Sequence, residues 1–188
     1  MPGYLIDTQT ITYWFDGKSG GYQVVQTAAE ARRSADSPLY LSAISLGEIQ
    51  YGHAVHPAGA GPVRESFVKF VRDKFPQVLM VSRHTAEPYG RIRAALFDKL
   101  GPKPRKSKRK RAEELCDPTT GRELGIDEND LWIVAQAAER NLILVTHDKM
   151  VRIRDALQEP EIGVQIEDWA AGHEATGRTD AQGEKKRE

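Results

Sequence analysis

The chain has 188 residues, 39% of them hydrophobic and 29% charged, which is enough for one packed domain and short for two. No apolar run approaches the roughly 18 residues needed to cross a bilayer, and the start of the chain does not resemble a signal peptide. Cys116 is the only cysteine, which excludes an intrachain disulfide and a cysteine-based zinc site. We therefore expect a cytoplasmic protein.

Short apolar runs alternate with helical patterns along the chain. The first run, Tyr4–Ile6, ends at Asp7-Thr8 and predicts a buried strand that leads into a helix. Further strands are predicted at 39–41, 78–81, 142–145 and 164–166. Apolar residues recur at helical spacing in two intervening segments, at Val63, Phe67, Phe70 and Val71 and at Ile133, Val134, Ala137 and Ala138. This alternation predicts an α/β domain whose mostly parallel sheet is covered by helices on both faces.

Two segments depart from this pattern. Residues 101–125 are rich in Pro, Gly and like charges, and we expect them to form a flexible insertion. Residues 172–188 are polar and are expected to form a disordered tail, so that residues 1–171 make a single domain.

The net charge of zero is unevenly distributed along the chain. Of 27 basic residues, seven lie within positions 103–111, and without them 20 basic residues stand against 27 acidic ones, a balance of about −7. Phosphate contact is one interpretation of this basic segment, and a solvated loop is an equally good one. The seven residues are Lys103, Arg105, Lys106, Lys108, Arg109, Lys110 and Arg111.

Four acidic residues follow strands or lie near the starts of helices. Asp7 and Asp148 come after apolar runs, and Asp130 lies near the start of the helix that contains Ile133. Glu48 lies in a helix predicted to begin near Ser42 or Ser45. Ligands of open α/β sheets bind at the carboxyl ends of the strands, so these acids are expected to meet at one rim.

Acids gathered in this way repel one another, and a divalent cation removes that cost. Oxygen ligands favour Mg²⁺ or Mn²⁺ over Zn²⁺, and such ions assist phosphodiester hydrolysis.

Each acid also has a purely structural interpretation. Asp7 or Thr8 could cap the first helix, Asp148 could cap another, and Glu48 could lie on a solvated helix face. Asp127 and Asp130 have the spacing of a capping box. Capping does not require all the acids to project toward one rim, so the set as a whole favours a shared site.

The acidic residues and the segments around them resemble those of the PIN-domain ribonucleases, particularly the VapC-type toxins of toxin–antitoxin pairs. The resemblance lies in Tyr4-Leu5-Ile6-Asp7-Thr8, in the segment 42–52 with Glu48 followed by Gly52, in Asn129 to Ala137, in Leu142 to Asp148 and in the closing Ile166-Glu167-Asp168-Trp169. These segments occur in the family's order over most of residues 3–169. The basic insertion is the departure, because it lengthens the connection before the third acidic motif.

The resemblance implies a PIN-like three-layer α/β/α fold and an endoribonuclease that hydrolyses RNA with a metal-activated water. It carries over Asp7, Glu48, Asp130 and Asp148 as catalytic metal ligands for Mg²⁺ or Mn²⁺, with Thr8 and Thr146 as supporting hydroxyls. It also implies a small antitoxin partner and a homodimer.

Other residues and functions are less well supported by the sequence. His147, beside Asp148, fits a neutral surface histidine better than a general base, and the three tryptophans fit a core better than a binding platform. Cys116 has no evident partner for nucleophilic catalysis. An aspartate-nucleophile phosphotransferase fits poorly because Gln9 stands where a second acid is needed. The main alternative is a non-enzymatic nucleic-acid-binding or regulatory protein that uses the basic segment.

Overall fold

The computed structural model describes residues 2–17, 22–55, 61–100, 126–158 and 162–171. The predicted insertion at 101–125, with the seven basic residues at 103–111 and Cys116, and the predicted tail at 172–188 therefore lie outside the described residues. The single-domain organisation stays a prediction.

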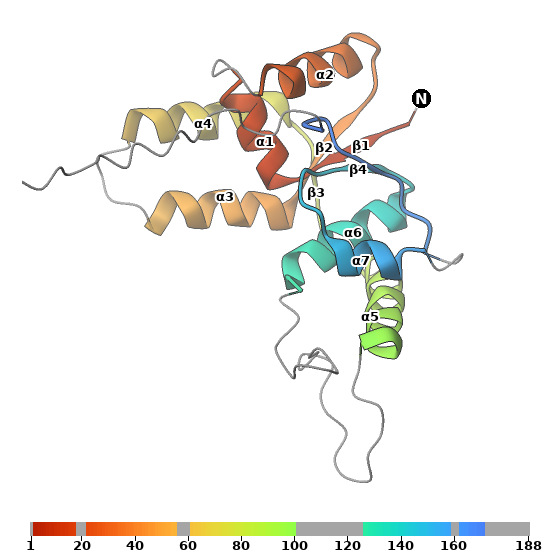
Figure 1. Ribbon diagram of the computed structural model, residues 1–188. Coiled ribbons are helices and arrows are strands. Elements are labelled where there is room, and N and C mark those ends of the chain that lie inside the picture. Colours follow the sequence, from red (N-terminus) through yellow and green to blue (C-terminus); the bar gives the residue numbers. More distant parts are fainter. Residues whose placement is uncertain (1, 18–21, 56–60, 101–125, 159–161, 172–188) are drawn as a thin grey trace, which may run out of the picture.

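Strands and helices alternate along the described chain, as the sequence predicts (Figure 1). In order, the elements are β1 (Tyr4–Ile6), α1 (Thr8–Phe15), α2 (Gln23–Ser34), β2 (Leu39–Ser42), α3 (Ala43–Val55), α4 (Gly61–Lys74), β3 (Val78–Leu79), α5 (Ala86–Leu100), α6 (Glu128–Arg140), β4 (Ile143–Val145), α7 (Val151–Ala156) and β5 (Ile166–Glu167). No helix among these is both long and apolar enough to span a membrane.

The five strands form one sheet in the order β3-β2-β1-β4-β5, and every neighbouring pair is parallel. The central strands β1 and β4 pair residue for residue, with Tyr4 opposite Ile143 and Ile6 opposite Val145. The chain therefore leaves β1 and β4 at the same level of the same rim.

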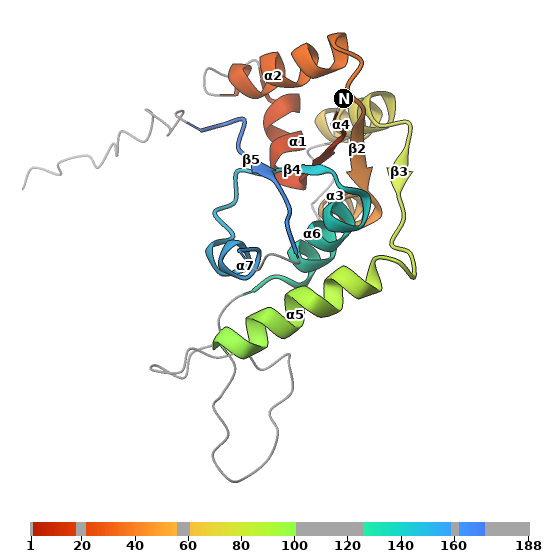
Figure 2. The same cartoon turned by 90° about the vertical axis from the view of Figure 1, so that its right-hand side faces the viewer.

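Helices cover both faces of the sheet and make three layers (Figure 2). Leu5 and Leu144 pack into a core with residues of α5, α6 and α7, whereas their strand neighbours Ile6 and Val145 pack with residues of α1, α2, α3 and α4. Alternate strand residues point to opposite faces, so β1 and β4 each contribute side chains to both cores. The predicted α/β/α architecture is confirmed.

The predicted strand at 78–81 was too long. Among the described residues β3 is an edge strand whose only neighbour is β2, and their register pairs Leu41 with Val78 and Ser42 with Leu79. Because β2 ends at Ser42, where α3 begins, Met80 and Val81 have no strand to pair with, and both side chains are exposed. The late strand is likewise shifted and covers Ile166–Glu167 instead of 164–166.

No helix was predicted for 23–34 or 86–100, where the structure has α2 and α5. A helix was expected after Asp148, and α7 begins at Val151. In α5 the buried residues Ile92 and Leu96 are four apart, which is a helical spacing that the sequence contains. Helix α5 packs against α6 and α7 and thereby holds α6 over the sheet.

Candidate active site

The rim where β1 and β4 end carries the first predicted acid. Asp7 follows β1 directly, and its backbone N–H donates to the carbonyl of Val145 at 3.0 Å. Asp7 is buried, with only 6% of its surface exposed. One carboxylate oxygen of Asp7 accepts from the backbone N–H of Thr8 at 2.8 Å, and the other accepts from the hydroxyl of Thr146 at 2.9 Å. Asp7 thus caps α1, as the structural interpretation expected, and also belongs to a polar group on this rim.

Burial raises the pKa of Asp7 above its ordinary value, against the lowering effect of its two hydrogen bonds. The negative charges of Glu48 and Asp148 raise this pKa further. Glu48 on α3 and Asp148 in the loop after β4 are therefore close enough to Asp7 for their charges to disfavour its ionisation.

Glu48 lies in the second turn of α3, not on an open helix face. It is partly buried, and its two carboxylate oxygens accept from the hydroxyl of Thr8 at 2.5 Å and from the side-chain amide of Asn129 at 2.7 Å. Glu48 therefore ties α3 to the starts of α1 and α6. Asn129 belongs to one of the segments that carry the family resemblance, but the sequence predicted no role for it. Its position next to Asp130 was the feature that could have indicated one.

Asp130 is the third residue of α6 and not its cap, which is Asp127. The carboxylate of Asp127 accepts from the backbone N–H of Asn129 at 2.8 Å, as its structural interpretation predicted. Burial, followed by the charges of Asp7, Asp127, Asp148 and Glu48, raises the pKa of Asp130 to about 7. Each of the other three predicted acids is therefore close enough to Asp130 to raise its pKa.

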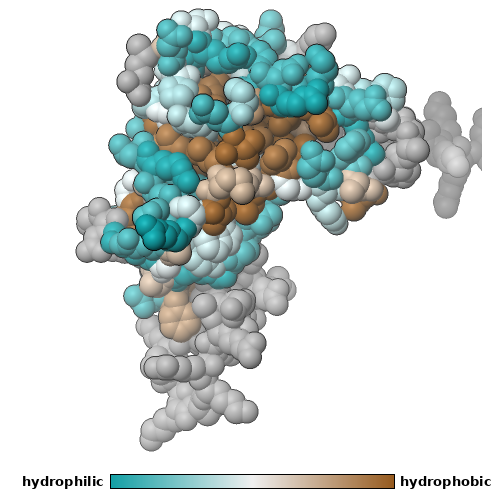
Figure 3. Space-filling view, turned by 180° about the vertical axis from the view of Figure 1, so that it is seen from behind, coloured by the Kyte–Doolittle hydropathy of each residue, from teal (hydrophilic) through white to brown (hydrophobic). Residues whose placement is uncertain are grey.

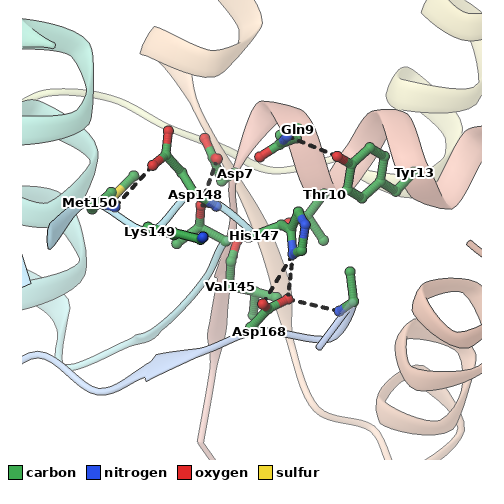
Figure 4. A network of polar contacts seen from close by, with 12 residues as sticks. Asp7, Gln9, Thr10, Tyr13, Val145, His147, Asp148, Lys149, Met150 and Asp168 are labelled. Atoms are coloured by element: carbon green, nitrogen blue, oxygen red, sulfur yellow. Dashed lines mark hydrogen bonds and ion pairs between the residues drawn. The ribbon is translucent and has the colours of Figure 1, made fainter. Parts of the chain in front are cut away.

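Asp148 completes the cluster from the loop between β4 and α7 (Figure 4). Its backbone N–H donates to the hydroxyl of Thr146 at 3.0 Å, and its carboxylate accepts from the backbone N–H of Met150 at 2.9 Å. Asp148 is exposed and does not cap α7, whose N-cap is Met150. The buried hydroxyl of Thr146 thus links Asp7 and Asp148.

The donor set of this cluster suits a hard divalent cation. All four acids offer carboxylate oxygens, and no basic side chain is among the causes that shift the pKa of Asp7 or Asp130. Within the described ranges, no group of three or more His, Cys, Asp and Glu side chains is arranged as a metal site. The fit to a cation therefore rests on the charge of the acids and not on their geometry. The roles of Asp7, Glu48, Asp130, Asp148, Thr8 and Thr146 in holding a metal stay predictions.

His147 does not join the carboxylate cluster. It is partly buried, and its Nδ1 lies 3.0 Å from a carboxylate oxygen of Asp168, while its ring contacts the edge of Tyr13 (Figure 4). The side chain of His147 is still 34% exposed, but the sequence did not predict its contact with Asp168, which follows β5 and lies beside the end of β4.

Two tryptophans lie in the core, as expected. Trp14 and Trp169 are 3% and 7% exposed, whereas Trp132 is only partly buried and stacks on Tyr89.

Comparisons with known proteins agree with this architecture. The PIN domain family model matches residues 4–156. Among solved structures, VapBC2 from Rickettsia felis, bound to a DNA fragment from its promoter, has 20% identity and a TM-score of 0.61, and the match covers 88% of this chain and 98% of that one. DNA-bound VapBC from Salmonella typhimurium has 22% identity and a TM-score of 0.60, with 90% and 99% covered. FitAcB from Neisseria gonorrhoeae has 20% identity and a TM-score of 0.57, with 87% and 95% covered. No curated protein matches the chain.

Proposed function

The chain belongs to the PIN-domain family, and we propose that it is a metal-dependent endoribonuclease that hydrolyses RNA phosphodiester bonds. The observation that carries this proposal is the convergence of four acids that are far apart in the sequence: the charges of Asp7, Asp148 and Glu48 add to the effect of burial in raising the pKa of Asp130. Acids held this close repel one another, and a bound cation would offset that repulsion. A metal-dependent nuclease binds a divalent cation at such acids and uses the same cation in catalysis.

The four carboxylates would hold Mg²⁺ or Mn²⁺, which prefer oxygen ligands. The cation would neutralise charge on the phosphodiester and activate water for in-line displacement. The chain's own residues fix the acids in place: Thr146 orients Asp7, and Thr8 with Asn129 orients Glu48. Hydrogen bonds of this kind hold the carboxylates in one orientation before a ligand arrives.

We also propose that the protein is the toxin of a toxin–antitoxin pair. Its structural neighbours from Rickettsia and Salmonella are VapBC complexes. Seen from behind, the surface has a broad apolar area bordered by hydrophilic side chains (Figure 3), and Met80 and Val81 beside the edge strand are exposed. Apolar areas of this kind favour protein partners, which supports the predicted antitoxin and homodimer. Action in the cytoplasm is part of this proposal.

The proposal is tested by incubating the full chain with a panel of single-stranded and hairpin RNAs in Mg²⁺, in Mn²⁺ and with a chelator. We expect cleavage with either metal and none with the chelator. Asp7→Asn should reduce cleavage by at least about 100-fold while the protein stays folded and still binds RNA. Asp98→Asn, an exposed acid on α5, is the matched control and should cleave like the wild type.

Two results would contradict the proposal. One is a purified wild-type protein that cleaves none of the RNAs with either metal, which would favour a nucleic-acid-binding protein instead. The other is an Asp7→Asn variant with full metal-stimulated activity, which would remove the acidic cluster from the reaction.

A further inference from the structure

A pocket of about 410 Å³ opens directly beside the acidic cluster. Its walls are the start of α6 and residues 148–153, which lead from β4 into α7. Asp130 and Asp148 line the pocket and also belong to the cluster, so the pocket is continuous with the proposed cleavage site. Its volume lies within the range of pockets that take small ligands, roughly 300–1,000 Å³.

Two basic side chains, Lys149 and Arg152, line this acidic pocket. Several basic residues elsewhere in the described part of the fold have acidic partners, such as Arg32 with Glu167 and Lys74 with Glu30. Within the part of the chain that the structure describes, the side chains of Lys149 and Arg152 make no hydrogen bond or ion pair, although Asp148 is adjacent in sequence to Lys149. Their charges are thus available to an anion that enters the pocket.

The same pocket has an apolar part. Met150 and Ile153 are buried and line its interior, and Val151 is 61% exposed at its edge. A ligand that carries both an anionic group and a flat or apolar portion would match this combination of charged and apolar walls. One nucleotide of an RNA strand has that composition.

An RNA strand that approaches the cluster brings one negative charge per phosphate toward four carboxylates. A cation held by the acids compensates the charge at the cleaved bond, but not that of the neighbouring phosphate. Lys and Arg are the side chains that bind phosphate oxygens most strongly, and here they flank Asp148 on the side of the pocket.

Resting on the proposed function, we infer that this pocket receives the nucleotide adjacent to the cleaved bond and that Lys149 and Arg152 bind its phosphate. The two cations therefore position the RNA and take no part in the bond cleavage itself. Their removal should weaken RNA binding and raise KM, with little change in kcat.

The test is the double variant Lys149→Ala/Arg152→Ala in the full chain. Its matched control is Lys69→Ala/Arg72→Ala, which removes the same two residue types at the same spacing from the exposed surface of α4. RNA affinity is measured by fluorescence anisotropy with a labelled single-stranded RNA over a series of salt concentrations. Asp7→Asn is added to every protein in this assay so that the RNA stays intact.

We expect the pocket variant to lose about 0.7 from the slope of log affinity against log salt, since the two side chains together neutralise one phosphate and each neutralised phosphate on a single strand contributes about 0.7. Affinity at fixed salt should fall roughly tenfold, and the control should change neither value. Lys149→Arg/Arg152→Lys, which keeps both charges, should retain the slope. In the cleavage assay, with Asp7 intact, the pocket variant should have a raised KM.

Equal slopes in the pocket variant and the control overturn the inference, whether or not the wild type cleaves RNA. An unchanged KM in the pocket variant overturns it as well. Failure of the proposed function has a different signature, because it is the absence of metal-stimulated cleavage by the wild type. The anisotropy assay needs no cleavage, so the two failures are separate results.

Discussion

Helix α6 carries a partly buried carboxylate near each end, and their surroundings differ. Burial raises the pKa of Glu139, but the hydroxyls of Thr85 and Ser82 and the charge of Arg140 outweigh this, so the pKa of Glu139 lies below its ordinary value. At the other end, burial and four acidic neighbours raise the pKa of Asp130 to about 7. The helix dipole alone would favour the charged form at the N-terminal end, so burial and the neighbouring side chains together decide which of the two pKa values is higher.

The comparison separates two uses of a partly buried acid. Glu139 has its charge matched by donors within the fold, which makes it a structural group that joins α6 to the segment before α5. The causes that shift the pKa of Asp130 include burial and acidic neighbours but no donor or basic side chain, so Asp130 fits a group that binds a cation from solution. Four substitutions test this difference, and they follow from the largest expected effect to the smallest.

Glu139→Ala should cause the largest loss of stability. It leaves the fully buried hydroxyl of Thr85 without its acceptor and removes one of the two acceptors of the Arg140 guanidinium, which should cost about 2–3 kcal/mol of unfolding free energy. Urea denaturation measures this loss, and cleavage per folded molecule should be unchanged. Glu87→Ala, which removes an exposed ion pair with Arg91, is the control and should cost less than about 0.5 kcal/mol. Equal costs for the two would remove the structural role of Glu139.

Asn129→Ala should impair activity more than stability. It removes the amide that donates to Glu48, and loss of a group that orients a metal ligand typically costs about 10–100-fold in metal affinity or activity. Mn²⁺ titration and cleavage kinetics measure both. We expect the lost cleavage to return partly at high Mn²⁺ concentration, whereas a purely structural role for Asn129 would show no such metal dependence.

Asp130→Asn should stabilise the metal-free protein at alkaline pH. The pKa of Asp130 is raised from 3.8 to about 7, so the folded state disfavours its charge, and this penalty is complete above pH 7 and absent below about pH 4. Because Asp130 is partly exposed, we expect a gain of about 1–2 kcal/mol at pH 8 with a chelator present, less than the full shift implies. Thermal unfolding at pH 8 and at pH 4 measures it, and the gain should vanish at the lower pH.

The same variant sharpens the comparison when metal is added. Wild-type protein should gain about 2.7 kcal/mol at a Mg²⁺ concentration 100-fold above its Kd, and Asp130→Asn should gain much less at that concentration. A variant that is stabilised by Mg²⁺ as strongly as the wild type would show that Asp130 does not hold the cation.

Asn141→Gly should have the smallest effect. Asn141 ends α6 in the left-handed conformation, with φ at 51°, and glycine adopts this conformation without steric cost. We expect a gain of a few tenths of a kcal/mol, with cleavage and metal affinity unchanged. A loss of activity on this substitution would mean that the C-terminal end of α6 contributes to the site after all.

Much of the fold could be predicted because a buried parallel strand is recognised from a short run of consecutive apolar residues. Tyr4–Ile6 was predicted with the bounds of β1, and the placement of Asp7 directly after it follows from those bounds. The strand at 78–81 could not be bounded correctly, since its length depends on where β2 stops and not on its own residues. The supporting contact of Asn129 with Glu48 joins residues from α6 and α3, and no local pattern reveals it.

By itself, the sequence determined the α/β class and the position of each acid relative to a strand end or a helix start, because strand and helix periodicities are local properties of the chain. The tertiary structure alone decided the sheet order that brings the ends of β1 and β4 to one level, and with it the pairing of His147 with Asp168. It also decided which carboxylates are matched by donors and which are not. Electrostatic strain depends on distance in space, and residues such as Asp7 and Asp130 become neighbours only when the chain has folded.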